Sequence, residues 1–291
     1  MNTIVLTQSN IVAGSNNSSL IYNFPNSVRF ENHQVAVQSV SMYYSWVNIN
    51  PSPLGNNTFS YKWVIGSTTT TYTITIPTGL YEISDLNNYM QYTFIMNGHY
   101  LINSTAQNVY YAEFLVNPNT YAINIITYPV PTSLPSGWSA PTANVQTGAL
   151  AWGGYPTTYF NPLITIPSKF NLIMGYAAGF TTSQNTGNNT ILTYTSSVSP
   201  QVQPYPNALL TVSNISNNYS SPSSVLYNVV ADVGFGQLIK SSPNEYIFSD
   251  LLKGTINSLV VRFTNSDNSS MNILDGNMTI ILLIREKPKN D

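Results

Sequence analysis

Residues 71–76 read Thr-Tyr-Thr-Ile-Thr-Ile, an unbroken alternation of threonine with larger, less polar side chains. In an extended chain, successive side chains point to opposite faces, so Tyr72, Ile74 and Ile76 share one face and the threonines share the other. A strand with one buried face requires this pattern. The stretch predicts an antiparallel sheet that covers a core on one side.

The same alternation recurs later in the chain. Residues 109–116 and 121–125 alternate in the same way, and the link Asn-Pro-Asn-Thr at residues 117–120 predicts a hairpin between them. Near the C-terminus, residues 259–263 and 278–284 also alternate, and the polar link between them predicts a second antiparallel pair.

The segment from Val35 to Tyr44 breaks its own alternation. Val35 and Val37 fall on odd positions, whereas the next large side chains, from Val40 to Tyr44, fall on even positions. One extra residue in the strand restores the facing, so the pattern predicts a β-bulge around Gln38 and Ser39.

Helical signals are few. Ser84 is placed to cap a helix whose apolar side chains, Leu86 and Met90 among them, follow helical spacing, and Gly98 is placed to end it. A second, single-turn helix is expected at residues 249–253.

Together these elements predict an all-β protein, an antiparallel β-sandwich with one short helix. The alternation fits an immunoglobulin-like and a jelly-roll sandwich equally well. We expect one domain over residues 1–291, because no flexible linker interrupts the chain. The five prolines between residues 129 and 156 indicate that an insertion or long loops lie within residues 129–206.

Charge is scarce. Lys and Arg number 9 and Asp and Glu 11, so 7% of the chain is charged, where about 25% is usual. Cations that are so few and so scattered cannot line a phosphate-binding groove, and nucleic acid is therefore not an expected partner. The cations of residues 285–289 are expected to lie in a solvated tail. No apolar run reaches the ~20 residues of a membrane helix, and no signal peptide is recognised, so no membrane partner is expected.

Catalytic candidates are sparse. His33 and His99 are expected in turns or at the surface, and no nucleophile elbow or metal-ligand motif accompanies them. Asp267 and Asp275 flank a polar turn without calcium-loop spacing. The acids Glu82, Asp85 and Glu113 are the nearest approach to a glycosidase pair, although the first two are explained by the start of a helix. We therefore predict no enzyme, no catalytic residue, no metal and no cofactor.

The aromatic side chains have two interpretations. Those at residues 43–46 and 152–155, with Trp63 and Trp138, suit either a sugar-binding platform or a core and subunit contacts. Because strands favour aromatic residues, core or subunit contacts are the preferred interpretation.

Several stretches resemble one family. Residues 22–49, which run from Tyr-Asn-Phe-Pro to Trp-Val-Asn-Ile, resemble the opening of the penton (minor capsid) proteins of virophages and polinton-like viruses, most closely the mavirus type. The likeness continues at residues 222–230, at Phe-Gly-Gln (235–237) and at the closing strand, residues 275–285. The resemblance does not extend to residues 129–203.

The resemblance implies a structural virion protein. It implies a jelly-roll subunit that forms homopentamers at the five-fold vertices of an icosahedral capsid, contacts the viral major capsid protein and assembles inside the infected host cell. The insertion would then be a surface for a host receptor or glycan. The alternative is a carbohydrate- or receptor-binding β-sandwich, such as a fibre head or a lectin-like domain. The resemblance assigns no interface residue.

Overall fold

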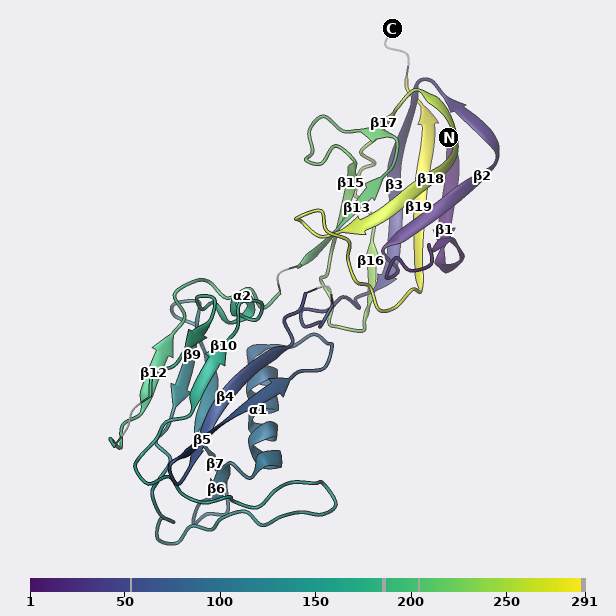
Figure 1. Cartoon of the computed structure of the whole chain (residues 1–291). Helices are drawn as coiled ribbons and strands as arrows, with labels where there is room; N and C mark the ends of the chain where they lie inside the picture. The colour runs from purple at the N-terminus through teal and green to yellow at the C-terminus, as the bar shows by residue number, and fades with distance from the viewer. Residues whose placement is uncertain (53, 185–186, 204, 289–291) are drawn as a thin grey trace. The chain divides into compact units, whose positions relative to one another are not determined.

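The computed structural model describes residues 1–52, 54–184, 187–203 and 205–288. The chain folds into two compact units (Figure 1). One unit combines Met1–Val47 with Tyr205–Asp291, and the other is the continuous segment Asn48–Pro204, called the inserted unit below. The single domain expected over residues 1–291 is therefore divided, and the elaborated middle begins about eighty residues before the predicted 129–206, because it has a core of its own.

Among its described residues, the first unit contains ten strands and one 3₁₀ turn. They are β1 (Asn2–Thr7), η1 (Gln8–Asn10), β2 (Ser19–Phe30), β3 (His33–Tyr43), β13 (Asn207–Val212), β14 (Ile215–Ser216), β15 (Val225–Val230), β16 (Leu238–Ser241), β17 (Ser249–Leu251), β18 (Gly254–Thr264) and β19 (Met278–Glu286).

The pairing of these strands identifies a jelly roll. One sheet has the order β1-β19-β3-β17-β14, with β16 also on β3, and the other has the order β15-β13-β18-β2. Along the chain, the first strand pairs with the last, β2 with β18, β3 with β16 and β17, and β13 with β15. A long hairpin rolled into two sheets produces this nested pairing. In the sequence, the inserted unit lies between β3 and β13, the third and fourth strands of the jelly roll.

The predicted bulge is confirmed. In the pairing of β19 with β3, Ile281 lies opposite Ser39 and Leu282 lies opposite Val37, so Gln38 has no partner. Val37 and Val40 are consequently both buried. The extra residue shifts the alternation by one position and keeps both halves of the strand facing the core.

Two other expectations for this unit are wrong. Residues 259–263 and 278–284 are strands with the predicted buried faces, but they do not pair, because β18 and β19 lie in different sheets. Residues 249–253 do not form a helical turn: Ser249–Leu251 is the strand β17, which pairs with β3, and Gly254 begins β18.

The inserted unit is also mainly β. It contains β4 (Thr58–Ile65), β5 (Thr68–Thr75), α1 (Ile83–Asn97), β6 (Tyr100–Ile102), β7 (Asn108–Tyr110), β8 (Ala112–Asn117), β9 (Ala122–Thr127), β10 (Leu163–Ile166), α2 (Asn171–Met174), β11 (Phe180–Thr181) and β12 (Leu192–Thr195). The sheets are β11-β10-β4-β5 and β12-β9-β8, with β6 and β7 as a separate hairpin. The predicted hairpin at residues 117–120 is confirmed as the turn between β8 and β9.

The helix α1 closes over the core of the inserted unit. Its buried side chains recur every three or four residues, at Ile83, Leu86, Met90 and Phe94, and pack with the aromatic side chains of β4 and β8. Glu82, and not Ser84, is the N-cap, and its backbone N–H donates to the Asp85 carboxylate at 2.9 Å.

The helix ends where the sequence predicts, at Gly98 in the left-handed conformation. The longest stretch between strands, residues 128–162, is irregular and crosses this unit, as the prolines indicated. Within the described chain, no helix has the length and apolar character needed to cross a bilayer.

Candidate functional site

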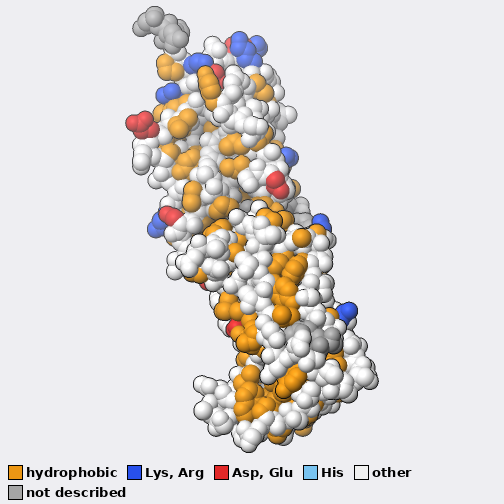
Figure 2. Space-filling view, turned by 90° about the vertical axis from the view of Figure 1, so that its left-hand side faces the viewer, with side chains coloured by type: hydrophobic (Ala, Val, Ile, Leu, Met, Phe, Trp, Pro, Cys, Tyr) orange, Lys and Arg blue, Asp and Glu red, His pale blue; other side chains and the backbone are white. Residues whose placement is uncertain are grey.

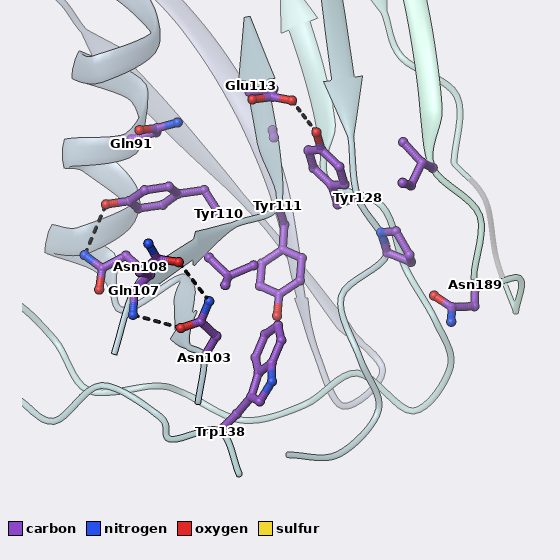
Figure 3. Close-up of a pocket in the computed structure, with 14 residues that line it drawn as sticks. Gln91, Asn103, Gln107, Asn108, Tyr110, Tyr111, Glu113, Tyr128, Trp138 and Asn189 are labelled. Carbon is purple, nitrogen blue, oxygen red and sulfur yellow. Dashed lines mark hydrogen bonds between the residues drawn. The ribbon is translucent and has the colours of Figure 1, made fainter. Parts of the chain in front are cut away.

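A hollow of about 710 Å³ opens in the inserted unit (Figure 3). Its walls come from α1, the β6–β7 hairpin, the start of β8, the loop that follows β9 and the segment before β12. Ligand pockets fall in the range of about 300–1,000 Å³, so the volume suits a small-molecule site. The hollow is assembled from residues 91 to 191, far apart in the sequence.

Aromatic side chains form one side of the hollow. Tyr110, Tyr111, Tyr128 and Trp138 line it, and Tyr111 points its ring toward Trp138 (Figure 3). Tyr111 is 3% exposed, and its hydroxyl has no hydrogen-bond partner among the described residues. Burial raises the pKa of this phenol above its ordinary value, so it stays protonated at neutral pH.

One carboxylate lines the hollow. Glu113 projects from β8 and accepts a short hydrogen bond from the Tyr128 hydroxyl (Figure 3). Burial, together with the bonded carboxylate, raises the pKa of Tyr128 to about 12. The phenol therefore stays protonated and holds the carboxylate in place.

The predicted acids do not converge. Glu82 and Asp85 cap the start of α1 and are absent from the walls, so Glu113 is the only acid among the described residues that line the hollow. Glycoside hydrolysis in its usual form needs two carboxyl groups that flank the scissile bond. The hollow does not provide that pair.

Amide side chains complete the walls. Asn103 folds the turn between β6 and β7, because its Oδ1 accepts from the backbone N–H of Gln107 at 2.9 Å and from the Thr105 hydroxyl at 2.8 Å. The Asn108 amide donates to the Tyr110 hydroxyl at 3.2 Å. These bonds fix the shape of the hairpin wall (Figure 3).

Two further amide side chains line the hollow without a hydrogen-bond partner among the described residues. The side chains of Gln91, on α1, and Asn189, before β12, make no hydrogen bond to any described residue. Each carries a carbonyl acceptor and two N–H donors. Both are therefore free to bond to water or to a ligand.

The structure corrects the expectation for His99. The ring is 2% exposed, stacks on Trp63 with centroids 4.4 Å apart, and has its Nδ1 2.8 Å from the Tyr61 hydroxyl. Burial lowers its pKa to about 3, so it is a neutral core residue. His33 is half-buried at the start of β3 in the other unit, packed edge-on against Phe30.

The other sequence candidates have structural roles. Asp267 accepts from the backbone N–H of Ser269 and Asp275 from that of Asn277, as expected of polar turns. Within the described chain, no cluster of three or more His, Asp or Glu lies close enough to hold a metal.

The tryptophans divide between core and hollow. Trp63 is buried in the core of the inserted unit, and Trp46 is buried with its indole N–H donating to the Tyr205 carbonyl at 2.9 Å. Trp138 alone of the four lines the hollow. The core interpretation is therefore correct for Trp46 and Trp63, whereas Trp138 lines a hollow of ligand size. Its loop position carried no periodic signal that distinguished it.

Charge is distributed unequally between the units. Only five charged residues occur between Asn48 and Pro204, and the jelly-roll unit carries all the others. On the face seen in Figure 2, side chains of the inserted unit are mostly uncharged and polar or hydrophobic. The five are Lys62, Glu82, Asp85, Glu113 and Lys169.

The C-terminal cations are partly ordered, contrary to the solvated tail expected at residues 285–289. The Arg285 guanidinium lies 3.6 Å above the Phe248 ring, and it donates to Gln34. Lys287 pairs with Asp250 at 2.8 Å. Lys289 lies outside the described residues.

Comparisons with known proteins give a likeness among solved structures. No protein-family model matches the chain, and no curated protein matches it. Among solved structures, the crystal structure of the SeMet-labelled mavirus penton protein is similar over 98% of this chain and 100% of its own, with 9% sequence identity and a TM-score of 0.42. At this distance no functional residue is transferred from it.

Proposed function

We propose that this chain is a structural capsid protein, a penton subunit that forms homopentamers at the five-fold vertices of an icosahedral virion and contacts the major capsid protein. The observation that carries the proposal is the nested strand pairing of the jelly-roll unit, from β1 with β19 to β13 with β15. Jelly rolls build viral capsids, and also lectins and cupins, so the fold needs further support.

The resemblance found in the sequence provides the first support. The quoted residues 22–49, 222–230, 235–237 and 275–285 fall almost entirely in the jelly-roll unit, where they form β2, β3, β15 and β19. The unmatched residues 129–203 fall in the inserted unit. The likeness therefore covers the part of the chain that would form the capsid shell.

The surface of the jelly-roll unit provides the second support. Large apolar side chains are exposed on it, among them Val5 on the edge strand β1, Val230 on the edge strand β15, and Ile247, which is 75% exposed. These side chains are available for burial against a neighbouring subunit. In a closed ring, each subunit buries two different surfaces against its neighbours.

Solution mass tests the proposal. Light scattering coupled to size exclusion is expected to give about 160 kDa, five copies of a 32.1 kDa chain, with five-fold rings in negative-stain images. A trimer contradicts the proposal. So does a monomer that also fails to bind purified major capsid protein, because a vertex subunit must join its shell.

A further inference from the structure

We propose that the hollow of the inserted unit binds a neutral oligosaccharide. A capsid role does not require such a site, and a binding failure here leaves the pentamer untouched. The site is the one lined by Tyr110, Trp138, Gln91, Glu113 and Asn189, and its chemistry defines the ligand class.

The aromatic wall matches the apolar face of a sugar ring. A pyranose presents a face of C–H groups and a rim of hydroxyls, so it binds where a flat apolar surface lies beside hydrogen-bonding groups. Tyr110 and Trp138 are each half-buried, with part of the ring open to the hollow (Figure 3). Such side chains combine an apolar body with a polar tip.

The amide groups match the hydroxyl rim. Gln91 and Asn189 approach from different elements, and neither side chain has a hydrogen-bond partner among the described residues. A hydroxyl both donates and accepts, and an amide offers both functions in one group. A ligand rich in hydroxyls therefore satisfies groups that the fold leaves open.

The Tyr111 hydroxyl adds a buried polar atom at the same wall. It has no partner in the described chain, and it lies where Tyr111 points toward Trp138. Buried polar groups are nearly always paired, so this exception needs an explanation, and a contact with a ligand or water is one.

Charge restricts the ligand to a neutral one. The inserted unit has two cations, Lys62 and Lys169, and neither lines the hollow. Among the described residues that line the hollow, Glu113 is the only charged one, and its carboxylate repels sialic acids, sulfated sugars and phosphates. A nucleic acid is disfavoured for the same reason, since its binding depends on phosphate contacts with Lys and Arg.

A binding assay on the full chain tests the inference. Saturation-transfer NMR and a glycan array are used with four neutral probes, methyl mannoside, methyl galactoside, methyl N-acetylglucosaminide and lactose, and with sialyllactose as the anionic comparison. We expect at least one neutral probe to bind, and sialyllactose to bind no better than lactose. Absence of binding by every neutral probe, or preferential binding of sialyllactose, overturns the proposal.

Variants locate the binding. Trp138→Ala removes the aromatic wall, and Gln91→Ala removes an amide without breaking a bond inside the protein. Each is expected to weaken binding about tenfold. The matched control is Tyr92→Ala, because Tyr92 is the next residue on α1, is 53% exposed and does not line the hollow.

Circular dichroism establishes that each variant folds. If Trp138→Ala fails to fold, Gln91→Ala decides the question alone, since that side chain has no partner among the described residues. Undiminished binding in a folded Gln91→Ala variant, or an equal loss in Tyr92→Ala, contradicts the proposed site.

Discussion

Acid is expected to destabilise the inserted unit through one side chain, His99. The ring is buried against Trp63, and its pKa is lowered from 6.5 to about 3. The Tyr61 hydroxyl accepts from the Asn97 amide and so is left to donate to His99 Nδ1, which suits a neutral imidazole. In the unfolded chain the same imidazole takes up a proton near pH 6.5.

The sign and size of the effect follow from linkage. Below pH 6.5 the His99 imidazole binds a proton in the unfolded state but not in the folded state. The free energy of unfolding therefore decreases as the pH falls from about 6.5 to about 3. A tenfold difference in proton affinity between the two states corresponds to about 1.4 kcal/mol. Between pH 7 and pH 4 the inserted unit should therefore lose roughly 3 kcal/mol of unfolding free energy.

Urea unfolding followed by tryptophan fluorescence measures this loss. Three of the four tryptophans, Trp63, Trp138 and Trp152, belong to the inserted unit, so the signal reports mainly on it. At typical urea slopes of about 1–3 kcal/mol/M, the midpoint should fall by roughly 1–3 M between the two pH values. His99→Gln should be less stable at pH 7 but should lose most of the pH dependence.

The control is the other imidazole. His33→Gln removes a histidine from the jelly-roll unit and should keep the wild-type fall in midpoint. The reasoning is refuted if wild type and His99→Gln lose the same stability between pH 7 and pH 4, because the acid sensitivity then arises elsewhere.

Three further predictions concern packing and backbone. Tyr111→Phe removes a buried hydroxyl that has no partner in the described chain and should raise stability by about 1 kcal/mol in urea unfolding, whereas Tyr176→Phe, equally buried but bonded to backbone groups, should cost ~1–3 kcal/mol. Gly98→Ala should cost at least ~2 kcal/mol by the same measurement, since φ is 67° and the new Cβ would lie 2.4 Å from a backbone oxygen; an unchanged midpoint contradicts this. Deleting Gln38 should leave a jelly-roll unit that is folded by circular dichroism, because the deletion removes only the bulge. Deleting Ser41 should unfold that unit, because the deletion exchanges the buried and exposed faces of part of β3. Equal behaviour of the two deletions refutes the register.

Sequence reasoning succeeded where the property is local. Ile74 and Ile76 are buried while their threonine neighbours are exposed, and the bulge lies at Gln38, because side-chain alternation is a property of any extended backbone. Gly98 ends α1 because only a residue that tolerates positive φ suits that position.

Sequence reasoning failed where distant segments decide the outcome. The strands at residues 259–263 and 278–284 have the predicted buried faces but not the predicted partner. His99 has a turn-like local context, yet Trp63 and Tyr61, from a strand far along the chain, bury it. Alternation gives the direction of a side chain and carries no information about which strand supplies the next hydrogen-bonding edge.

The sequence by itself determined the all-β class, the buried faces of the strands, the C-terminal end of the main helix and the scarcity of charge. Only the tertiary structure decided the jelly-roll pairing, the extent of the inserted unit and the hollow that joins Gln91, Glu113 and Trp138. The physical reason is the sequence separation of the interacting residues. Local patterns depend on neighbours along the chain, whereas strand order and the hollow depend on which distant segments pack together.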